Sequence, residues 1–172
     1  NITTTGAQSY GGAVTLASNA ITLSTSNSAV SFSSTLNGSQ ALTLTAGTGT
    51  ISFGGVVGGN SALASLTITD ASPTTITNNI TTTGAQTYNG SVTLATNAIT
   101  LSTTNSAISF SSTVNGGGQA LTLTAGTGVI TFSDVVSALA SLAITNASLT
   151  TIHNNITTTG AQSYGGAVTL AS

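Results

Sequence analysis

The sequence repeats itself, and this periodicity restricts the fold more than any other feature. The octapeptide Asn-Ile-Thr-Thr-Thr-Gly-Ala-Gln starts at Asn1 and recurs at Asn79 and Asn155, which are offsets of 78 and 76 residues. The offsets differ through short length changes in stretches rich in Gly and Asn, where loops tolerate insertions. The chain therefore divides into a first repeat (residues 1–78), a second (79–154) and a partial third (155–172), which we expect to form one continuous structure.

A shorter period lies inside the long one. Residues 20–23 align with residues 41–44 at an offset of 21, and the same offset carries residues 30–32 onto 51–53. Apolar and polar residues alternate in these segments, which is the periodicity of a β-strand, and Thr, Val, Ile and Phe all favour a pleated surface. No segment shows the spacing of an amphipathic helix. We therefore predict an all-β fold.

The 21-residue period favours a solenoid. Strands of three to five residues are too short to form independent sheets, but a coil of about 21 residues can close one turn and stack on the next. With a strand spacing of about 4.8 Å, roughly eight coils would extend about 40 Å. We predict a parallel β-solenoid with long repeats of 76–78 residues. Residues 76–78 and 80–82 do not fall on the 21-residue register, so three and four coils per long repeat both fit the sequence.

A tandem of small β-sandwiches is the competing all-β architecture. The dipeptide Asn-Gly begins at Asn37, Asn89 and Asn115, and it is typical of hairpin turns. A sandwich predicts longer strands joined by such hairpins, whereas the 21-residue self-alignment favours the solenoid. Antiparallel hairpins as the dominant pairing would contradict the solenoid.

Stacked coils predict inward ladders of apolar side chains and outward ladders of Thr. Ile21 would stack on Leu42, with Thr22 and Thr43 facing outward, and the Asn and Gly residues between strands suit left-handed or tight corner positions. The predicted structural core ladders comprise Val14, Leu16, Ile21, Leu23, Val30, Phe32, Leu42, Leu44, Ile51, Phe53, Val92, Leu94, Ile99, Leu101, Ile108, Phe110, Leu121, Leu123, Ile130 and Phe132.

The near absence of charge excludes several classes of partner. The chain has no Lys or Arg, two acidic residues and one His, while hydrophobic residues make up 39% of it. Without cations it cannot neutralise phosphates, so we expect no nucleic-acid binding and no docking on anionic membranes. No apolar run approaches the roughly 20 residues of a membrane span, and we expect no membrane insertion. The absence of an initial Met or signal-peptide pattern suggests an excerpt of a longer protein.

The residues that could carry chemistry are few. Glycoside cleavage generally needs two carboxylates that flank the bond, but Asp70 and Asp134 lie 64 residues apart and the repeat preserves neither. His153 has no Cys, Glu or second His as a co-ligand, so we expect an exposed corner residue. We therefore predict no catalytic site, no cofactor-binding site and no metal site in these residues.

Three tyrosines are preserved by the repeat, at Tyr10, Tyr88 and Tyr164. An aromatic ring that stacks on a sugar is one interpretation. We favour a ring that covers a corner of the thin core while its hydroxyl group lies in water.

The repeats resemble those of large bacterial surface exoproteins. The segments Gly-Ala-Gln-Thr-Tyr-Asn-Gly at residues 84–90, Val-Thr-Leu at 92–94, Gly-Thr-Gly at 126–128 and Ile-Thr-Phe at 130–132 are similar to repeats of filamentous haemagglutinin-like adhesins. Such proteins are exported by two-partner secretion or as autotransporters. The resemblance covers the whole chain and implies a right-handed β-helix, an extracellular location at the bacterial cell surface and a role in adhesion, biofilm or surface coating.

These observations predict a structural function. We expect an adhesin stalk, filament or surface layer that associates with identical chains or continues as the same repeat array, because little charge opposes lateral association. The sequence does not identify a surface glycan or host receptor. The alternative is an ice-binding β-solenoid that presents Thr ladders, since Thr-x-Thr triplets begin at Thr43, Thr67, Thr75 and Thr122.

Overall fold

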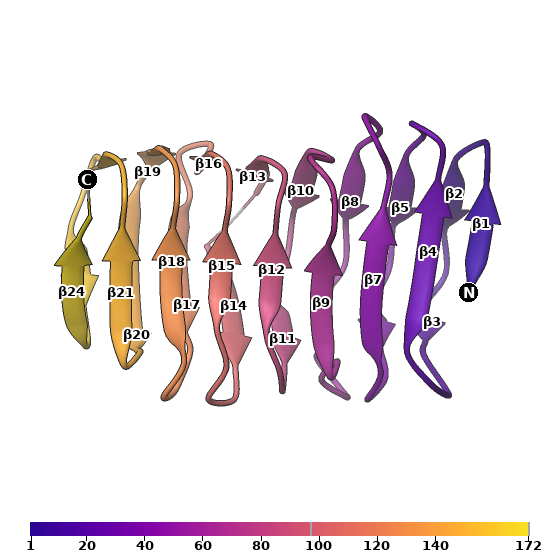
Figure 1. The fold of residues 1–172 in the computed structure, drawn as a ribbon, viewed down its shortest axis with the longest axis horizontal. Helices are drawn as coiled ribbons and strands as arrows, with labels where there is room; N and C mark the ends of the chain where they lie inside the picture. Colours follow the sequence, from indigo (N-terminus) through magenta and orange to yellow (C-terminus); the bar gives the residue numbers. More distant parts are fainter. Residues whose placement is uncertain (97, 172) are drawn as a thin grey trace.

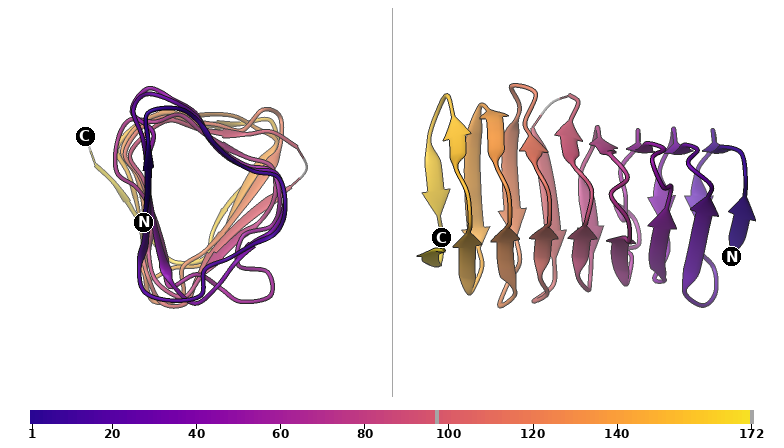
Figure 2. Two further views of the ribbon diagram at one scale, coloured as in Figure 1. Left: turned by 90° about the vertical axis from the view of Figure 1, so that its right-hand side faces the viewer. Right: turned by 45° about the horizontal axis from the view of Figure 1, so that its top comes forward.

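The chain forms a right-handed parallel β-solenoid of about eight coils. The computed structural model describes residues 1–96 and 98–171, and these residues contain strands and turns but no helix. Viewed along its axis from the N-terminal end, the solenoid has a three-sided cross-section (Figure 2). The chain winds clockwise as it recedes from the viewer, which makes the solenoid right-handed. Each side is a parallel sheet whose strands stack along the long axis (Figure 1).

The three sheets are named A, B and C in the order in which the chain visits them. Sheet A contains β1 (Ile2–Thr4), β4 (Ile21–Thr25), β7 (Ala41–Thr45), β9 (Ser65–Ile68), β12 (Gln86–Tyr88), β15 (Ile108–Phe110), β18 (Val129–Phe132), β21 (Leu149–Ile152) and β24 (Ala167–Leu170). Sheet B contains β2 (Gln8–Tyr10), β5 (Val30–Phe32), β8 (Ile51–Phe53), β10 (Thr74–Ile76), β13 (Val92–Leu94), β16 (Val114–Asn115), β19 (Val136–Leu139) and β22 (Ile156–Thr158). Sheet C contains β3 (Val14–Thr15), β6 (Leu36–Asn37), β11 (Ile80–Thr82), β14 (Ile99–Thr103), β17 (Ala120–Thr124), β20 (Ser141–Asn146) and β23 (Gln162–Tyr164), and single-residue bridges of Val57 join β6 to β11.

The pairing confirms the solenoid and rules against the sandwich. All strand pairs between described residues are parallel, and Ile21 pairs with Leu42 as the 21-residue offset predicted. The Asn-Gly dipeptides at Asn37 and Asn115 make no hairpin. They end the short strands β6 and β16, which pair with parallel strands of neighbouring coils.

Each long repeat occupies three and two-thirds coils, so neither three nor four was correct. The repeat that starts with β1 on sheet A starts again with β11 on sheet C and with β22 on sheet B. Each step passes eleven sheet positions, if the Val57 bridge counts as one, and 11/3 is three and two-thirds. Residues 76 and 80, which fitted no 21-residue register, end β10 on sheet B and begin β11 on sheet C.

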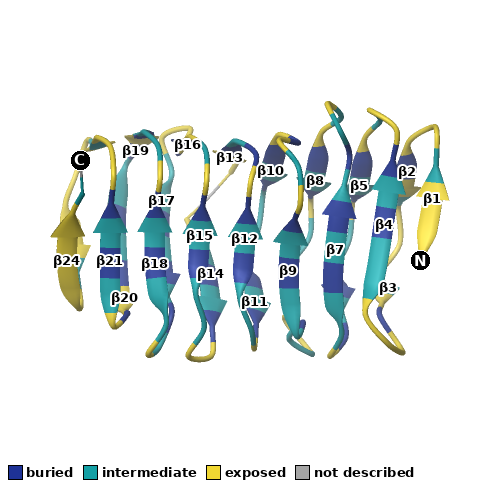
Figure 3. Cartoon of the chain, in the orientation of Figure 1, coloured by how far each residue is buried: buried dark blue, intermediate teal, exposed yellow. Residues whose placement is uncertain are grey.

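The apolar ladders fill the interior of the coils. Figure 3 shows buried residues on the strands between the first and last coils, whereas β1 and β24 at the ends are mostly exposed. Of the predicted core ladder, the structure buries all members except Val14 and Ile21, which are partly buried and pack against the core. Ile21 is less covered because Ile2 of β1 pairs with Leu23, so no residue of β1 lies over Ile21. Aromatic rings form two stacked ladders, with centroid separations of 5.0 Å for Tyr10–Phe32, 5.7 Å for Phe32–Phe53, 5.2 Å for Tyr88–Phe110 and 5.3 Å for Phe110–Phe132.

Asn and Gly occupy left-handed corner positions, as the sequence predicted. Asn27 and Asn105 have φ angles of 60° and 58°, and Gly47 and Gly126, which lie one coil further on, have 63° and 61°. A Cβ atom on Gly47 would collide with the Asn27 side chain, which is why only Gly fits there. The Asn27 Oδ1 accepts a hydrogen bond from the Thr48 backbone N–H at 3.1 Å, so the corner asparagine also links successive coils.

One core position carries a polar group without a partner. Thr150 on β21 is fully buried between Ile130 and Val168, and among the described residues its hydroxyl has no hydrogen-bond partner. Leaving a buried donor unsatisfied costs about 1–3 kcal/mol.

We therefore expect Thr150→Val, which is nearly isosteric and suits a strand, to raise the free energy of unfolding by about 1 kcal/mol or more. Guanidinium denaturation measures this change. Thr74→Val is the matched control, because Thr74 is the equivalent residue of the first repeat and its hydroxyl donates to the Ser72 carbonyl at 3.5 Å. A loss of stability in Thr150→Val would show that its hydroxyl has a partner after all.

Candidate functional site

The two carboxylates do not form a catalytic pair. Asp70 follows β9 and Asp134 follows β18, and the two strands are three coils apart on sheet A, roughly 14 Å at the spacing of β-strands. Carboxylates that cleave glycosides lie about 5–10 Å apart. The Asp134 carboxylate instead accepts hydrogen bonds from the Val135 backbone N–H at 2.7 Å and from the Asn154 side chain at 3.5 Å.

Asp70 organises a corner of the solenoid. Its Oδ2 accepts a hydrogen bond from the Gly47 backbone N–H at 2.5 Å, and its Oδ1 accepts from the Ser72 backbone N–H and hydroxyl. The buried Ser72 hydroxyl in turn contacts the backbone of Ala46 and Gly47. Asp70 therefore ties two successive corners together.

His153 is an exposed residue just after β21, as predicted. Its Nδ1 lies 3.3 Å from the Phe132 carbonyl oxygen in the preceding coil. Asp134 lies in that preceding coil at the same corner, but the two side chains form no ion pair in the part of the chain that the structure describes. No group of three or more His, Cys, Asp or Glu side chains that could hold a metal occurs among the described residues.

The most elaborate polar arrangement is inside the core. Gln86 and Tyr88 of β12 both point inward and are fully buried, and the Tyr88 hydroxyl donates to the Gln86 Oε1 at 2.9 Å. The Gln86 amide nitrogen donates to the Ser102 carbonyl at 2.9 Å, to the Ile80 carbonyl at 3.3 Å and to the Thr82 hydroxyl at 3.4 Å. We call these groups the Gln–Tyr cluster. It joins strands of sheets C and A across a corner.

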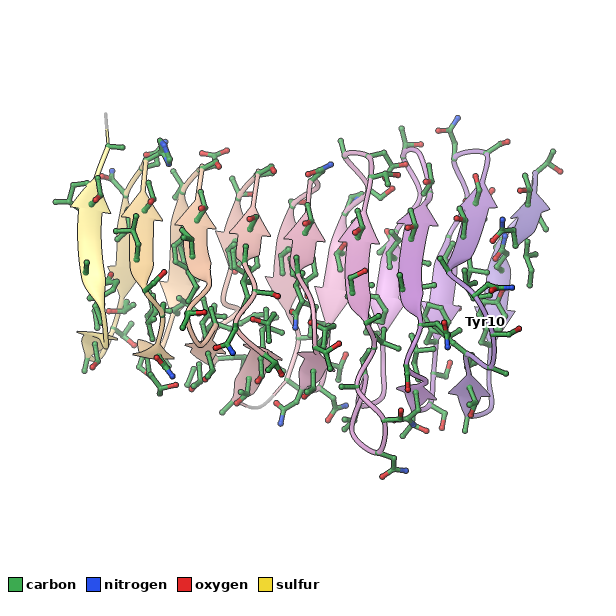
Figure 4. All side chains as sticks on the ribbon, turned by 60° about the horizontal axis from the view of Figure 1, so that its bottom comes forward. Tyr10 is labelled. Atoms are coloured by element: carbon green, nitrogen blue, oxygen red, sulfur yellow. The ribbon has the colours of Figure 1, made fainter. Side chains whose placement is uncertain are left out.

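The cluster recurs in each repeat, on a different pair of sheets. Tyr10 donates to Gln8 at 2.9 Å with Tyr10 on sheet B, and Tyr164 donates to Gln162 at 2.7 Å with Tyr164 on sheet C. Residues 1–18 and 155–172 are identical in sequence, so the same local sequence forms the same cluster on different sides of the solenoid. Figure 4 shows Tyr10 among the side chains near the N-terminus.

The prediction that these hydroxyls lie in water was wrong for Tyr88. Burial raises the pKa of Tyr88 far above its usual value, and it raises the pKa of the partly buried Tyr10 and Tyr164 as well. The glutamines were missed because a polar residue on a strand is expected to face solvent. The signal was the fixed Gln-x-Tyr spacing, which puts both side chains on one face of a strand.

The outward ladder predicted from Thr22 and Thr43 is confirmed, and it continues as one hydroxyl column along the outside of sheet A. The pairing register aligns one outward residue from each of eight successive strands, and we call them the threonine column: Thr22, Thr43, Thr67, Thr87, Ser109, Thr131, Thr151 and Thr169. Two residues before each member of the threonine column, at or just before the start of its strand, lies a column of mostly small side chains, the alanine column: Ala20, Ala41, Ser65, Ala85, Ala107, Val129, Leu149 and Ala167.

Sheet A is also the most regular of the three sides. It is the only sheet with nine strands in one uninterrupted order among the described residues, and its pairings continue without a register shift. Register shifts occur between β19 and β22 on sheet B and between β17 and β20 on sheet C. The length differences between the repeats fall in corner segments, at residues 38–40, 58–60 and 116–119, and leave the strands of sheet A in register.

Three open hollows lie on the surface of the described residues, and none of these three is an enclosed cavity. A hollow of about 380 Å³ and one of about 340 Å³ lie at the last and first coils, and core side chains such as Tyr164 and Phe32 line them. A third, of about 240 Å³, is lined by residues including Val56, Gly59 and Asn60, and the last two belong to the stretch 58–60 that has no counterpart in the second repeat. None contains Asp70 or Asp134.

Comparisons with protein-family models, with curated proteins and with solved structures found no match to this chain. The described residues include no helix that is both long and apolar enough to cross a membrane.

Proposed function

We propose that this chain is a structural element of an extracellular bacterial filament or surface layer, and that it works by self-association and without a catalytic site. The outer surface of the coils supports this proposal. Among the described residues, exposed large hydrophobic side chains occur only at the first and last coils, at Ile2, Val168 and Leu170. Between them, outward ladders of Thr, Ser, Asn and Ala cover the sides with almost no charge.

Such sides favour contact between identical chains. Surface charges, and lysines on edge strands above all, are the usual means by which β-proteins resist association, and this chain has no Lys or Arg. Stacked hydroxyl and amide ladders can also form hydrogen bonds with a neighbouring sheet. The lack of Lys and Arg further denies trypsin-like proteases a cleavage site, which suits material outside the cell.

Electron microscopy and fibre diffraction of the purified chain test this proposal. We expect filaments or sheets at high concentration, with a reflection near 4.8 Å along the fibre from stacked coils. A chain that stays monomeric at high concentration, with no periodic assembly, would contradict self-association.

Ice binding is the second candidate function, and the threonine column favours it. The column runs without a break from the first long repeat into the second. Its members in the second repeat, such as Thr87 and Ser109, are not the sequence equivalents of its members in the first, such as Thr22 and Thr43. Regularly spaced hydroxyl and methyl groups on a flat sheet could order surface water. Thermal hysteresis or shaping of ice crystals by the purified chain would support this function, and their absence would remove it.

A further inference from the structure

We infer that sheet A is the lateral interface of the assembly, and that its occupant is sheet A of a second copy of this chain. The inference rests on the proposed function and names the contact surface within it. Sheet A is, first, the most regularly paired side of the solenoid. The irregular pairings lie on the other two sheets, and the length changes between repeats fall in corner segments outside the strands, so sheet A continues without interruption.

The second argument is the unused hydrogen-bonding capacity of the threonine column. Among the described residues, none of its eight hydroxyls takes part in a hydrogen bond within the chain. In contrast, the neighbouring outward positions pair across coils, as the Thr45 and Thr69 hydroxyls do at 2.6 Å and the Ser111 hydroxyl and Asn89 do at 3.1 Å. The threonine column therefore has donors and acceptors left for a partner.

The two columns on sheet A are complementary to each other. A two-fold axis that runs parallel to the solenoid axis, between the columns, places the threonine column of each copy opposite the alanine column of the other. The larger threonines then meet small side chains over most coils, such as Ala41, Ala85 and Ala107, whereas Val129 and Leu149 make the contact tighter near the last coils. This arrangement is isologous, and the two solenoids point in the same direction.

The size of the face agrees with a specific interface. Nine strands at about 4.8 Å by about four residues at about 3.3 Å give roughly 570 Å² per copy. Specific interfaces bury about 600–1,000 Å² per partner, so sheet A alone comes close to the lower end of that range. Both carboxylates lie at the corner where the chain leaves sheet A, not within the two columns, so the contact brings no like charges together along the columns.

Two single lysine substitutions, one on sheet A and one on the next strand along the chain in sheet B, provide a matched test. Thr87 is the central member of the threonine column on β12, and Thr93 faces outward between the buried Val92 and Leu94 on β13 of sheet B. We expect sedimentation equilibrium to show lateral pairs for the wild type and for Thr93→Lys. In Thr87→Lys we expect the pair to dissociate about a hundredfold more readily or worse, because the interface would bury an unpaired charge. Circular dichroism confirms that both variants fold.

Cysteine cross-linking tests the orientation, and the chain has no cysteine of its own among the described residues. A mixture of Thr87→Cys and Ala85→Cys chains should form disulfide-linked heterodimers in higher yield than either variant forms homodimers. Assembly of Thr87→Lys equal to that of the wild type would overturn the inference while leaving the proposed function in place. A wild type that does not associate would instead overturn the proposed function. Thermal hysteresis that is lost in Thr87→Lys, without lateral pairs in the wild type, would assign sheet A to ice.

Discussion

Phe110→Ala is expected to reduce the free energy of unfolding by about 3–5 kcal/mol, the usual cost of removing a buried phenylalanine. Phe110 is the middle ring of the second aromatic ladder and is stacked on both sides, at 5.2 Å from Tyr88 and 5.3 Å from Phe132. Neither neighbour can fill the space, because the strand register holds each ring in its own coil. Chemical denaturation measures the loss.

The adjacent residue provides the control for this substitution. Ser109 faces outward on the same strand, and Ser109→Ala should change stability by no more than about 0.5 kcal/mol. Hydrogen exchange should show faster opening of the strands around β15 in Phe110→Ala, because each coil of a solenoid is stabilised mainly by its neighbours. Equal effects of the two substitutions would mean that the ladder contributes little to stability.

Alkaline pH is expected to destabilise the chain through its tyrosines. The sequence contains no Lys, Arg or Cys, so above about pH 9 the tyrosines are the side chains left to titrate. In the unfolded chain Tyr88 ionises near pH 10, whereas burial raises its pKa well above that value in the folded protein. The folded state therefore retains a proton that the unfolded state loses. The stability that Tyr88 contributes is present below pH 10 and is lost as the pH rises.

The magnitude follows from linkage between protonation and folding. One retained proton reduces the free energy of unfolding by up to about 1.4 kcal/mol per pH unit above the unfolded pKa, or about 2.3 kcal/mol from pH 10 to pH 12. Guanidinium denaturation at several pH values measures the slope, and absorbance near 295 nm follows phenolate formation. We expect Tyr88→Phe to reduce the slope, and to be less stable at neutral pH because the Gln86 Oε1 loses its donor. Complete phenolate formation near pH 10 in the folded chain would contradict the prediction.

Much of the interior could be predicted from the sequence, because two local rules determine it. Alternation places Ile21 and Leu23 on one face of a strand, and the 21-residue offset stacks them on Leu42 and Leu44. Both rules depend on spacing along the chain alone. The corner residues were predictable for a similar reason, since Asn and Gly tolerate left-handed backbone angles wherever they occur.

The buried polar groups could not be predicted in the same way. Gln86 is acceptable in the core only because coil closure brings the Ser102 carbonyl, 16 residues later, to its amide nitrogen. Hydropathy predicts that glutamine lies on the surface, and the sequence around Gln86 does not indicate that the Ser102 carbonyl will accept a hydrogen bond from it. The burial of Tyr88 depends on Gln86 in turn, because its hydroxyl needs a partner inside the core.

The sequence by itself determined that this chain stacks short parallel strands into coils with apolar ladders inside and uncharged ladders outside. Only the tertiary structure decided which side of the solenoid each strand occupies. That choice depends on how many residues each corner uses and on Val57, which takes a sheet position with a single bridging residue and leaves no strand pattern in the sequence. Each repeat fills eleven sheet positions, one short of four full coils, so the next repeat begins a third of a coil away. This offset moves Tyr88 from the sheet of Tyr10 to sheet A and aligns threonines from two repeats into one column.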